Sequence, residues 1–328
     1  MTPMNLGSRI YIAGHSGLVG QALTKEFIKN GYKNIITRTH AELDLINQEA
    51  VSEFFLKEKP EYVIIAAAKV GGIHANNTYP GEFIFINLAI QNNLIHQSYL
   101  CGVKRLLFLG SSCIYPKICP QPIKEEYLLM GFLEPTNRPY ALAKIAGLEM
   151  CWAYNRQYGT KFLTIMPTNL YGPGDKYDLQ NSHVIPALIR RFHEAKIRND
   201  KTVVIWGSGK VKREFLFVND MVKALIMIIN LDDIIFNRLL NNDKSNNIPP
   251  IINLGSNLEI SINDLANLIK DVVGFNGEII YDSSKPDGVS QKLLDSSRLN
   301  KLGWKSSTLL KNGLYESYKD FKKILNES

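Results

Sequence analysis

The chain has 328 residues, of which 45% are hydrophobic and 21% are charged. These fractions are those of an ordinary globular protein, and they exclude disordered and collagen-like chains. The net charge of +7 suits either a nucleic-acid-binding protein or an enzyme that holds several phosphates. The lysines and arginines are scattered instead of forming one tract, so we expect no nucleic-acid partner.

Targeting and redox signals point to a cytoplasmic protein. The first residues contain no long apolar segment typical of a secretory signal. The longest apolar runs, such as 63–68, are far shorter than the ~20 residues of a membrane span. Cysteines stand at positions 101, 113, 119 and 151 without a CxxC pair, and we expect free thiols. No group of ligand residues has metal-binding spacing, so no metal is expected.

Short apolar runs alternate with helical patterns along the first ~170 residues, which is typical of a parallel sheet covered by helices. The predicted strands are 9–13, 34–37, 62–67, 106–109 and 162–167. The predicted helices are 18–29, 49–57, 83–99 and 140–158. This order predicts an α/β fold with a doubly wound parallel (Rossmann) sheet.

After Pro173 the pattern changes, and the elements are expected to become irregular. Residues 215–218 and 251–254 have strand character and could return to the first sheet, whereas the Asn-rich segment 232–250 is expected to be a surface loop with part of a helix before it. We therefore expect a Rossmann domain and a smaller α/β C-terminal substrate domain. The expected division is 8–175 plus about 215–256 for the first domain, and 176–214 plus about 257–328 for the second.

A glycine-rich turn lies at the first strand-to-helix junction, in the segment from Gly14 to Gly20. Glycines suit this place because the chain turns tightly and a pyrophosphate must approach bare backbone N–H groups at a helix start. A chance turn explains many isolated motifs of this kind. Its place in an alternating chain favours a dinucleotide cofactor.

The end of the second strand distinguishes NADP from NAD. Here the sequence is Thr37-Arg38-Thr39-His40, and no acid occurs before Glu42. A basic residue at this place is typical of NADP sites, and an acid is typical of NAD sites. The segment favours NADP, although Arg38 is also consistent with a solvated loop residue.

Tyr140 and Lys144 lie at i and i+4, on one face of a predicted helix. A nearby ammonium stabilises tyrosinate and lowers the phenol pKa, so the phenol can deliver a proton to a developing alkoxide. The pair alone is common. Its place about 30 residues after a strand that ends in Gly110-Ser111-Ser112 favours a Ser111/Tyr140/Lys144 set, in which the serine holds a substrate carbonyl.

With these motifs the sequence resembles the extended short-chain dehydrogenase/reductases. Within them it is similar to the enzymes that convert GDP-4-keto-6-deoxy-D-mannose to GDP-L-fucose by 3,5-epimerisation and NADPH-dependent 4-keto reduction. The resemblance covers nearly the whole chain. Its segments are 66–80, 107–117, 133–147, 166–173, 181–195, 206–209, 213–215 and 284–288.

The resemblance implies two reactions in one pocket. Cys113 would be the base and His183 the acid of the epimerisation, and the adjacent ketone makes the sugar C–H protons acidic. Taken alone, either residue is more typical of a core or capping position. Tyr140 would then protonate the oxygen that Ser111 holds, while Lys144 keeps the phenol poised.

The resemblance also assigns the binding residues. Arg191 and Arg213 would hold the GDP phosphates, Trp206 would pack nearby and Asp287 would bond polar groups; the alternatives are surface arginines and a core tryptophan. The residues expected to contact NADP are Gly14, His15, Ser16, Gly17, Leu18, Val19, Gly20, Arg38, His40, Asp44, Leu45, Leu109, Gly110, Ser111, Ser112, Tyr140, Lys144, Pro167, Thr168, Asn169, Leu170 and His183.

Well-known members of the family carry arginines where this chain has Ser16 and His40. This difference weakens the expected preference for NADP over NAD. The family also implies a homodimer in which helices 83–99 and 140–158 form the contact. The second of these helices is apolar on more than one face, as a helix buried on two sides would be.

Two other functions fit parts of the pattern. The first is a sugar-nucleotide 4-epimerase or 4,6-dehydratase, but dehydratases typically place acids where this chain has Ser112-Cys113. The second is a non-catalytic NADP-binding sensor. Such proteins often lose the tyrosine or the lysine, and this chain keeps both Tyr140 and Lys144.

Overall fold

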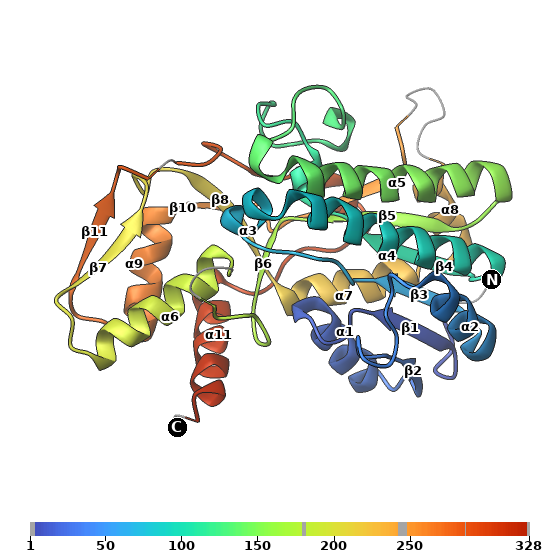
Figure 1. Ribbon diagram of the computed structural model, residues 1–328, viewed down its shortest axis with the longest axis horizontal. Helices are drawn as coiled ribbons and strands as arrows, with labels where there is room; N and C mark the ends of the chain where they lie inside the picture. The colour runs from blue at the N-terminus through green and yellow to red at the C-terminus, as the bar shows by residue number, and fades with distance from the viewer. Residues whose placement is uncertain (1–3, 179–181, 242–247, 286, 327–328) are drawn as a thin grey trace.

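The computed structural model describes residues 4–178, 182–241, 248–285 and 287–326. Its larger lobe is built on a six-stranded sheet in the order β2-β1-β3-β4-β5-β9 (Figure 1). All neighbouring strands in this sheet are parallel. The strands are β1 Arg9–Ala13, β2 Asn34–Ile36, β3 Tyr62–Ile65, β4 Arg105–Leu109, β5 Phe162–Pro167 and β9 Ile251–Leu254. The predicted doubly wound fold is therefore confirmed.

Helices cover both faces of this sheet, because side chains alternate between the faces along each strand. Ile10 and Ile12 of β1 join one core with the helices α1 Leu18–Lys29 and α7 Val218–Ile229. Tyr11 and Ala13 join a second core on the opposite face. The helices of that face are α2 Gln48–Glu58, α4 Pro80–Leu100 and α5 Arg138–Tyr158.

The elements of the larger lobe begin and end close to the predicted residues. Helix α1 matches its prediction at both ends, and β5 does so too. The sequence did not predict the short helix α3 Ile73–Thr78 or the three 3-10 turns, which are Ser112–Ile114, Glu125–Tyr127 and Pro135–Asn137. These short pieces lack the repeated apolar spacing on which such predictions depend.

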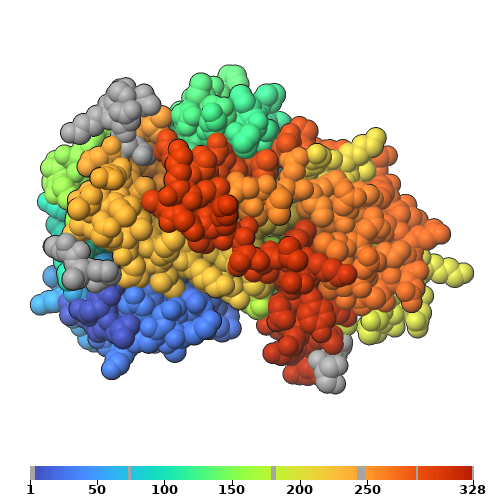
Figure 2. All heavy atoms as spheres, turned by 180° about the vertical axis from the view of Figure 1, so that it is seen from behind, coloured from blue at the N-terminus to red at the C-terminus, as the bar shows by residue number. Residues whose placement is uncertain are grey.

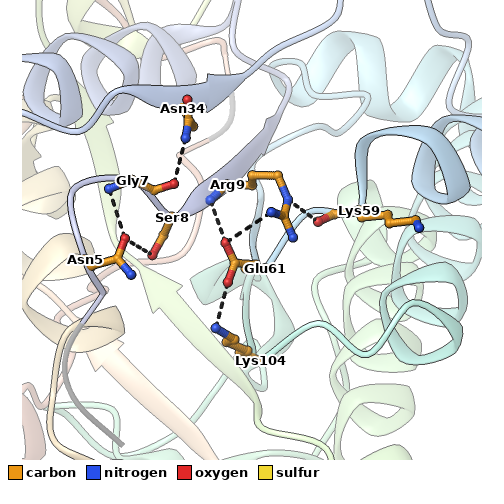
Figure 3. Close-up of polar contacts among 8 residues, drawn as sticks. All are labelled: Asn5, Gly7, Ser8, Arg9, Asn34, Lys59, Glu61 and Lys104. Carbon is orange, nitrogen blue, oxygen red and sulfur yellow. Dashed lines mark hydrogen bonds and ion pairs between the residues drawn. The ribbon is translucent and has the colours of Figure 1, made fainter.

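A network around Glu61 joins three strands at the edge of the sheet where they begin (Figure 3). The Glu61 carboxylate accepts a hydrogen bond from the Arg9 backbone N–H at 3.0 Å and from Lys104 Nζ at 2.6 Å. Arg9 Nε donates to the Lys59 carbonyl at 2.7 Å. These contacts fix the starts of β1, β3 and β4, and the opposite edge of the sheet carries the candidate site.

The smaller lobe lies beside the larger one and has its own core (Figures 1 and 2). Its sheets are short: β6 Asn169–Tyr171, β8 Lys212–Phe217 and β10 Glu259–Ser261 form one, while β7 Thr202–Trp206 pairs with β11 Glu278–Asp282. Its helices are α6 Val184–Ile197, α9 Ile262–Val273 and α11 Leu310–Ile324. This arrangement confirms the expected smaller α/β region.

Two predictions for the second half of the chain were wrong. The elements after Pro173 are regular, and only Ile251–Leu254 returns to the first sheet, as β9. Residues 215–217 instead belong to β8, which pairs with β6 and β10. The reason is that β8 lies between the lobes: Leu216 packs in the core of the larger lobe, and Phe215 packs in the core of the smaller one.

The Asn-rich segment also differs from the prediction. Helix α8 Asp233–Leu240 lies inside it, and the Asp232 side chain caps this helix by accepting from the Ile235 N–H at 2.9 Å. Phe236 of α8 is fully buried, and the Arg105 guanidinium lies 4.3 Å from its ring centre. Residues 242–247 of the segment lie outside the described residues.

The C-terminal segment returns to the larger lobe before the last helix. The short helix α10 Ser297–Asn300 carries Leu299, and Leu299 and Trp304 pack in the core formed by α1 and α7. Figure 2 shows this part of the chain (red) lying across the back of the larger lobe. Of the helices that the structure describes, none has the length and apolar character needed to cross a membrane.

Candidate active site

The candidate residues of the larger lobe follow the carboxyl ends of the parallel strands. Gly14 follows β1, Ser111 follows β4, and Thr168 follows β5. Because these strands are parallel, their ends meet at one edge of the sheet. In open α/β sheets this edge is the usual place for a ligand.

The glycine turn is shaped for a close approach of backbone. Gly14 has φ of +83°, and a Cβ there would lie 2.6 Å from the Ala67 nitrogen. A Cβ on Gly20 would overlap the Gly14 carbonyl oxygen. Gly17 precedes α1 and provides no side chain to cap it. The first N–H groups of α1 are therefore available to an anion such as a pyrophosphate.

His15, in the same turn, has a ring nitrogen with an unsatisfied hydrogen bond. Its Nδ1 atom is buried and has no partner among the described residues. Buried polar atoms are nearly always paired, so an unpaired one beside a helix start marks a place where a ligand supplies the partner. The turn thus fits a bound dinucleotide.

The side chains after β2 are placed as follows. Arg38 turns toward α2, where its guanidinium contacts Glu58 at 2.5 Å. The His40 side chain is exposed, and its Nδ1 lies 3.8 Å from Asp44. The Leu45 carbonyl accepts a hydrogen bond from Asn93 of α4 at 2.9 Å.

Ser111 lies between the end of β4 and the catalytic tyrosine candidate. Its hydroxyl oxygen accepts from the Cys113 N–H at 3.2 Å, which fixes the 3-10 turn Ser112–Ile114. The Ser111 side chain also lies close enough to the Tyr140 phenol to lower its pKa. The structure therefore brings together the strand end and the start of α5, as the sequence predicts.

Lys144 lies one turn after Tyr140 and is almost completely buried. Its Nζ donates to the Leu109 carbonyl at 2.8 Å and lies 5.8 Å from the centre of the Tyr140 ring. Burial lowers the pKa of Lys144 to about 7. Burial of the phenol, with a smaller effect of Cys113, raises the pKa of Tyr140 above its usual value, and the Ser111 hydrogen bond opposes this shift. Burial thus outweighs the lowering expected from the lysine.

Cys113 has two polar neighbours that the sequence did not identify. Asn137 Nδ2 lies 3.3 Å from the Cys113 sulfur, and Lys292 Nζ lies 3.7 Å from it. A cation and an amide donor are groups that favour the thiolate form of a cysteine. All four cysteines are free thiols, as predicted. Within the described residues, no cluster of three or more ligand side chains is arranged for a metal ion.

His183 immediately precedes α6, in the smaller lobe. Its side chain contacts solvent, but the surrounding protein lowers the pKa of the imidazole by desolvation. A histidine with a lowered pKa is a stronger acid when it is protonated. Its position on α6 places it in a different lobe from Cys113.

The segment after β5 connects the two lobes. Thr168 Oγ1 and Asn169 Nδ2 both donate to the Glu214 carbonyl, at 3.2 and 2.9 Å. Pro167 is the last residue of β5, and Leu170 is the middle residue of β6. The expected cofactor residues of this segment therefore lie where the chain passes from one sheet to the other.

The four expected substrate residues belong to the smaller lobe. Arg191 of α6 donates to the Val204 carbonyl of β7 at 2.7 Å. Trp206, at the end of β7, is 65% exposed. Asp287 accepts from the Ser208 N–H at 2.9 Å, close to the end of β7.

Arg213 of β8 is near Asp287. A Cβ on Gly288 would lie 3.0 Å from Arg213 Nη2, and the Asp287 charge opposes the burial that lowers the Arg213 pKa. The structure therefore brings Arg213 and Asp287 together beside β7. An exposed indole ring with a guanidinium and a carboxylate nearby can accept a base and its phosphates.

Comparison with known proteins identifies the family. The chain matches the model described as the NAD dependent epimerase/dehydratase family over residues 10–238. It is 52% identical over 314 residues to a protein of Oryza sativa subsp. japonica named probable GDP-L-fucose synthase 1, a match that covers 95% of this chain and 92% of that protein. The GDP-L-fucose synthase of Escherichia coli (strain K12) is 49% identical over 315 residues, covering 95% and 96%. The chain belongs to the GDP-L-fucose synthase family.

Solved structures of similar proteins agree with this membership. A GDP-L-fucose synthetase from Naegleria fowleri bound to NADP is 26% identical with a TM-score of 0.86, covering 99% of this chain and 97% of that one. A GDP-6-OMe-4-keto-L-xylo-heptose reductase from C. jejuni is 40% identical with a TM-score of 0.92, covering 98% and 99%. Membership in the GDP-L-fucose synthase family confirms the predictions of the fold and of an enzyme of the oxidoreductase type.

Two residues at this site of the GDP-L-fucose synthase family member were not predicted from the sequence, namely Lys292 and Asn137. Lys292 reaches Cys113 across 179 positions of the chain, because the Leu293 N–H donates to Gln121 Oε1 at 2.9 Å. Asn137 ends a 3-10 turn directly before α5. Both lie outside periodic elements, so no spacing pattern marked them. The nearness of Lys292 to the segment 284–288 was the one available signal.

Glu214 also has a role that the sequence did not predict. Its side chain is completely buried, and its carboxylate accepts from the Asn257 N–H at 2.7 Å and the Leu294 N–H at 3.0 Å. Burial raises the pKa of Glu214, and these backbone hydrogen bonds oppose that shift. Glu214 thus fixes the segment that places Lys292 beside Cys113.

Proposed function

We propose that this enzyme converts GDP-4-keto-6-deoxy-D-mannose into GDP-L-fucose by 3,5-epimerisation and then reduction of the 4-keto group with NADPH. Relatives named GDP-L-fucose synthase at about 50% identity support the overall reaction. The observation that supports both steps in one pocket is the position of Cys113. Its N–H donates to the Ser111 hydroxyl oxygen, and the Ser111 side chain in turn lowers the pKa of Tyr140.

The residues of the glycine turn fit NADP. The unpaired His15 Nδ1 and the uncapped start of α1 would hold its pyrophosphate, and Lys144 would reach its ribose. A relative of known structure is described as bound to NADP. When bound, the nicotinamide supplies the hydride for the 4-keto carbon.

Epimerisation requires a base and an acid on opposite faces of the sugar ring. In our proposal the Cys113 thiolate removes the proton beside the ketone, and His183 delivers a proton from the other face. Asn137 and Lys292, within hydrogen-bonding reach of the sulfur, would stabilise the thiolate. The Ser111 hydroxyl would hold the oxygen on which the enolate charge develops.

Reduction leaves an alkoxide at the sugar C4 atom, and Tyr140 would protonate it. Tyr140 is suited to this step because it lies beside Ser111, whose side chain lowers its pKa, so both hydroxyls can approach one substrate oxygen. Lys144 is held by the Leu109 carbonyl 5.8 Å from the phenol ring, so it would position and polarise the tyrosine.

The smaller lobe would bind the GDP. Arg191 and Arg213 would contact the diphosphate, the exposed Trp206 ring would pack against the nucleotide, and Asp287 would accept a hydrogen bond from it. We accordingly propose that the two lobes divide the work, with cofactor binding in the larger lobe and sugar-nucleotide binding in the smaller.

We also propose that the enzyme is a cytoplasmic homodimer. The four free cysteines are consistent with a reducing compartment. Helices α4 and α5 pack side by side and expose several apolar side chains, which supports their role as the contact. Those side chains are Phe85, Leu100, Leu142 and Tyr158, each at least 40% exposed.

A second candidate substrate follows from the structures. Enzymes described as GDP-heptose reductases or synthases are 39–40% identical to this chain. Their similarity favours, as the alternative substrate of this enzyme, a related GDP-4-keto sugar with a different substituent at C6. The residues around Cys113 and Tyr140 would act on that sugar in the same way.

The test is turnover in D2O. The enzyme is incubated with GDP-4-keto-6-deoxy-D-mannose and NADPH, and the deuterium in the product is located by NMR. We expect label at C3 and C5, consumption of NADPH and formation of GDP-L-fucose. Without NADPH oxidation the proposed reduction is wrong. A higher kcat/KM with a GDP-4-keto-heptose would favour the second substrate.

A further inference from the structure

The segment after β2 decides which nucleotide a doubly wound fold prefers. An NADP site places a cation at the 2′-phosphate of the adenosine, whereas an NAD site places a carboxylate at the 2′-hydroxyl. In this chain the segment 37–44 contains two basic residues, Arg38 and His40. Their surroundings determine whether either can serve a phosphate.

The Arg38 side chain is 32% exposed, but its guanidinium is already paired with protein groups. Its Nη2 contacts Glu58 of α2 at 2.5 Å, and its Nη1 donates to the Thr37 carbonyl at 2.7 Å. The guanidinium lies 5.4 Å from the centre of the Phe54 ring. Burial raises the pKa of Tyr11, and the charge of Arg38 opposes this shift to a smaller extent. These contacts all lie on the side of α2. The charge is already neutralised, and a phosphate would have to compete with Glu58 for it.

His40 and Ser16 offer little to a phosphate. The His40 side chain is 83% exposed, and its Nδ1 lies 3.8 Å from the Asp44 carboxylate. Ser16, in the glycine turn, is exposed and uncharged. An exposed imidazole beside a carboxylate is a poor partner for a dianion, because water and the acid both compete for it.

Glu42 adds a negative charge at the same place. Its carboxylate accepts from the Thr39 N–H at 2.7 Å and from the Thr39 hydroxyl at 2.8 Å. These hydrogen bonds, with smaller effects of Arg38 and His15, hold the Glu42 pKa below its usual value. The carboxylate is therefore ionised between the strand end and the glycine turn. A charge there repels a 2′-phosphate and can accept a hydrogen bond from a 2′-hydroxyl.

We propose that this site binds NAD(H) almost as tightly as NADP(H), so that the enzyme works with either nucleotide. The proposal rests on the proposed cofactor site but not on the sugar chemistry. It can therefore be tested by binding alone, with no sugar present.

The first test compares the dissociation constants of NADPH and NADH, measured from nucleotide fluorescence on the full chain at fixed ionic strength. A single charge-assisted bond between an arginine and a phosphate changes affinity by about ten- to a hundredfold. We expect less than a tenfold difference between the nucleotides. A preference for NADPH above tenfold would overturn the proposal. Failure to bind either nucleotide would overturn it too, whereas failure to turn over the sugar would not affect it.

The second test restores a cation. Ser16→Arg should strengthen NADPH binding by about tenfold or more and change NADH binding by less than twofold. The control is Thr202→Arg, at an exposed position at the start of β7 in the smaller lobe. It adds the same charge and should change neither the NADPH nor the NADH dissociation constant. Equal effects of the two variants on NADPH would contradict the proposal. Circular dichroism and a melting curve check that each variant is folded.

Discussion

At the scale of single residues, the geometry around Cys113 separates its role from those of the other cysteines. Cys113 has a cation and an amide donor at its sulfur. Burial instead raises the pKa of Cys119 and, much further, that of Cys151. A thiol whose pKa is raised is present as thiolate, the form that acts as a base, in only a very small fraction at neutral pH. The neighbours of Cys113 therefore distinguish it from the other cysteines as the proposed base.

Lys292 is expected to act through Cys113. In Lys292→Met the rate of deuterium incorporation at the sugar should fall by about ten- to a hundredfold, because the thiolate loses its nearest cation. Hydride transfer to an already epimerised 4-keto sugar should change much less. Lys292→Arg should restore part of the exchange rate. Cys119→Ser serves as the matched control, and an exchange rate unaffected by Lys292→Met would contradict this role.

Lys144 is expected to lower the stability of the cofactor-free protein. Its pKa is 10.5 in the unfolded chain and about 7 in the folded protein. Between these values the unfolded chain binds more protons, so the stability contributed by this site rises with pH. At pH 7, Lys144→Met should increase the free energy of unfolding by roughly 2 kcal/mol, and at pH 9.5 by much less.

Urea unfolding at the two pH values measures this effect. Lys25→Met, at an exposed position of α1, is the control and should show no pH-dependent difference from the parent protein. A Lys144→Met variant less stable than the parent at pH 7 would mean that the hydrogen bond to the Leu109 carbonyl outweighs the cost of burying the amine.

At the scale of elements, the sequence predicts strands and helices whose apolar residues repeat with a strong period, and it does not predict elements that lack such a repeat. Strands such as β4 and β5 are buried on both faces and are apolar except for Arg105 and Thr164, so their ends could be predicted within a residue. The strands β6 and β10 have only three residues each, too few for a pattern. The partner of β8 could not be predicted either, because its side chains enter both cores.

One missed helix did carry a local signal. Ser261 caps α9 by accepting from the Asp264 N–H at 3.0 Å, and Gly274 ends it with φ of +72°. A serine followed three residues later by an acid, and a glycine after the last apolar position, are typical helix boundaries. Lys292 and Asn137 had no comparable signal, because their contacts with Cys113 join residues 179 and 24 positions apart in the chain.

Glu214 is expected to join strand β8 to the active site. The two Glu214 carboxylate oxygens each accept from one backbone N–H. In Glu214→Gln an amide NH2 replaces one of these oxygens and faces a donor, which should destabilise the protein by about 2 kcal/mol. The segment of Lys292 would also loosen, so the KM for the GDP-sugar should rise by more than the Kd for the nucleotide cofactor. Binding and denaturation measurements on the same variant check both.

Glu259→Gln is the matched control for this prediction. Glu259 lies opposite Glu214 on β10, but its carboxylate pairs with the exposed Lys212 at the surface. It also accepts from Gln291 Nε2 at 2.6 Å, a hydrogen bond that the amide oxygen of a glutamine can still accept. Surface ion pairs contribute up to about 1 kcal/mol, so the control should lose little stability and keep its KM. Equal increases of KM and of the cofactor Kd in Glu214→Gln would indicate general destabilisation and not a loosened segment.

At the scale of the whole molecule, the chain crosses between the two lobes several times. It enters the smaller lobe after β5, returns at the junction of β8 and α7, and leaves the larger lobe again after β9. The segment of Leu299 and Trp304 then packs on the larger lobe before α11. Lys292 lies between these crossings and contacts Cys113 of the larger lobe. Of the two neighbours of the proposed base, Asn137 belongs to the larger lobe itself, and only Lys292 comes from the segment that connects the lobes.

The proposed dimer is the property of the whole molecule that a mutation can test most directly. Helices α4 and α5 run beside each other, and the rings of Tyr99 and Tyr158 stack 4.1 Å apart near their ends. Leu142 of α5 is 40% exposed on this pair of helices, although the side chain is apolar. A stable dimer covers about 800 Å² on each partner, which the exposed side of two 21-residue helices can provide.

Leu142→Glu should therefore convert the enzyme into a monomer, because an unpaired carboxylate in an apolar contact costs several kcal/mol. Light scattering after size-exclusion chromatography should give twice the 37.1 kDa of the chain for the parent protein and a single copy for the variant. Leu309→Glu, at a 69% exposed residue just before α11, should remain a dimer. A parent protein that elutes as a monomer, or a Leu142→Glu variant that stays dimeric, would mean that α4 and α5 are not the contact.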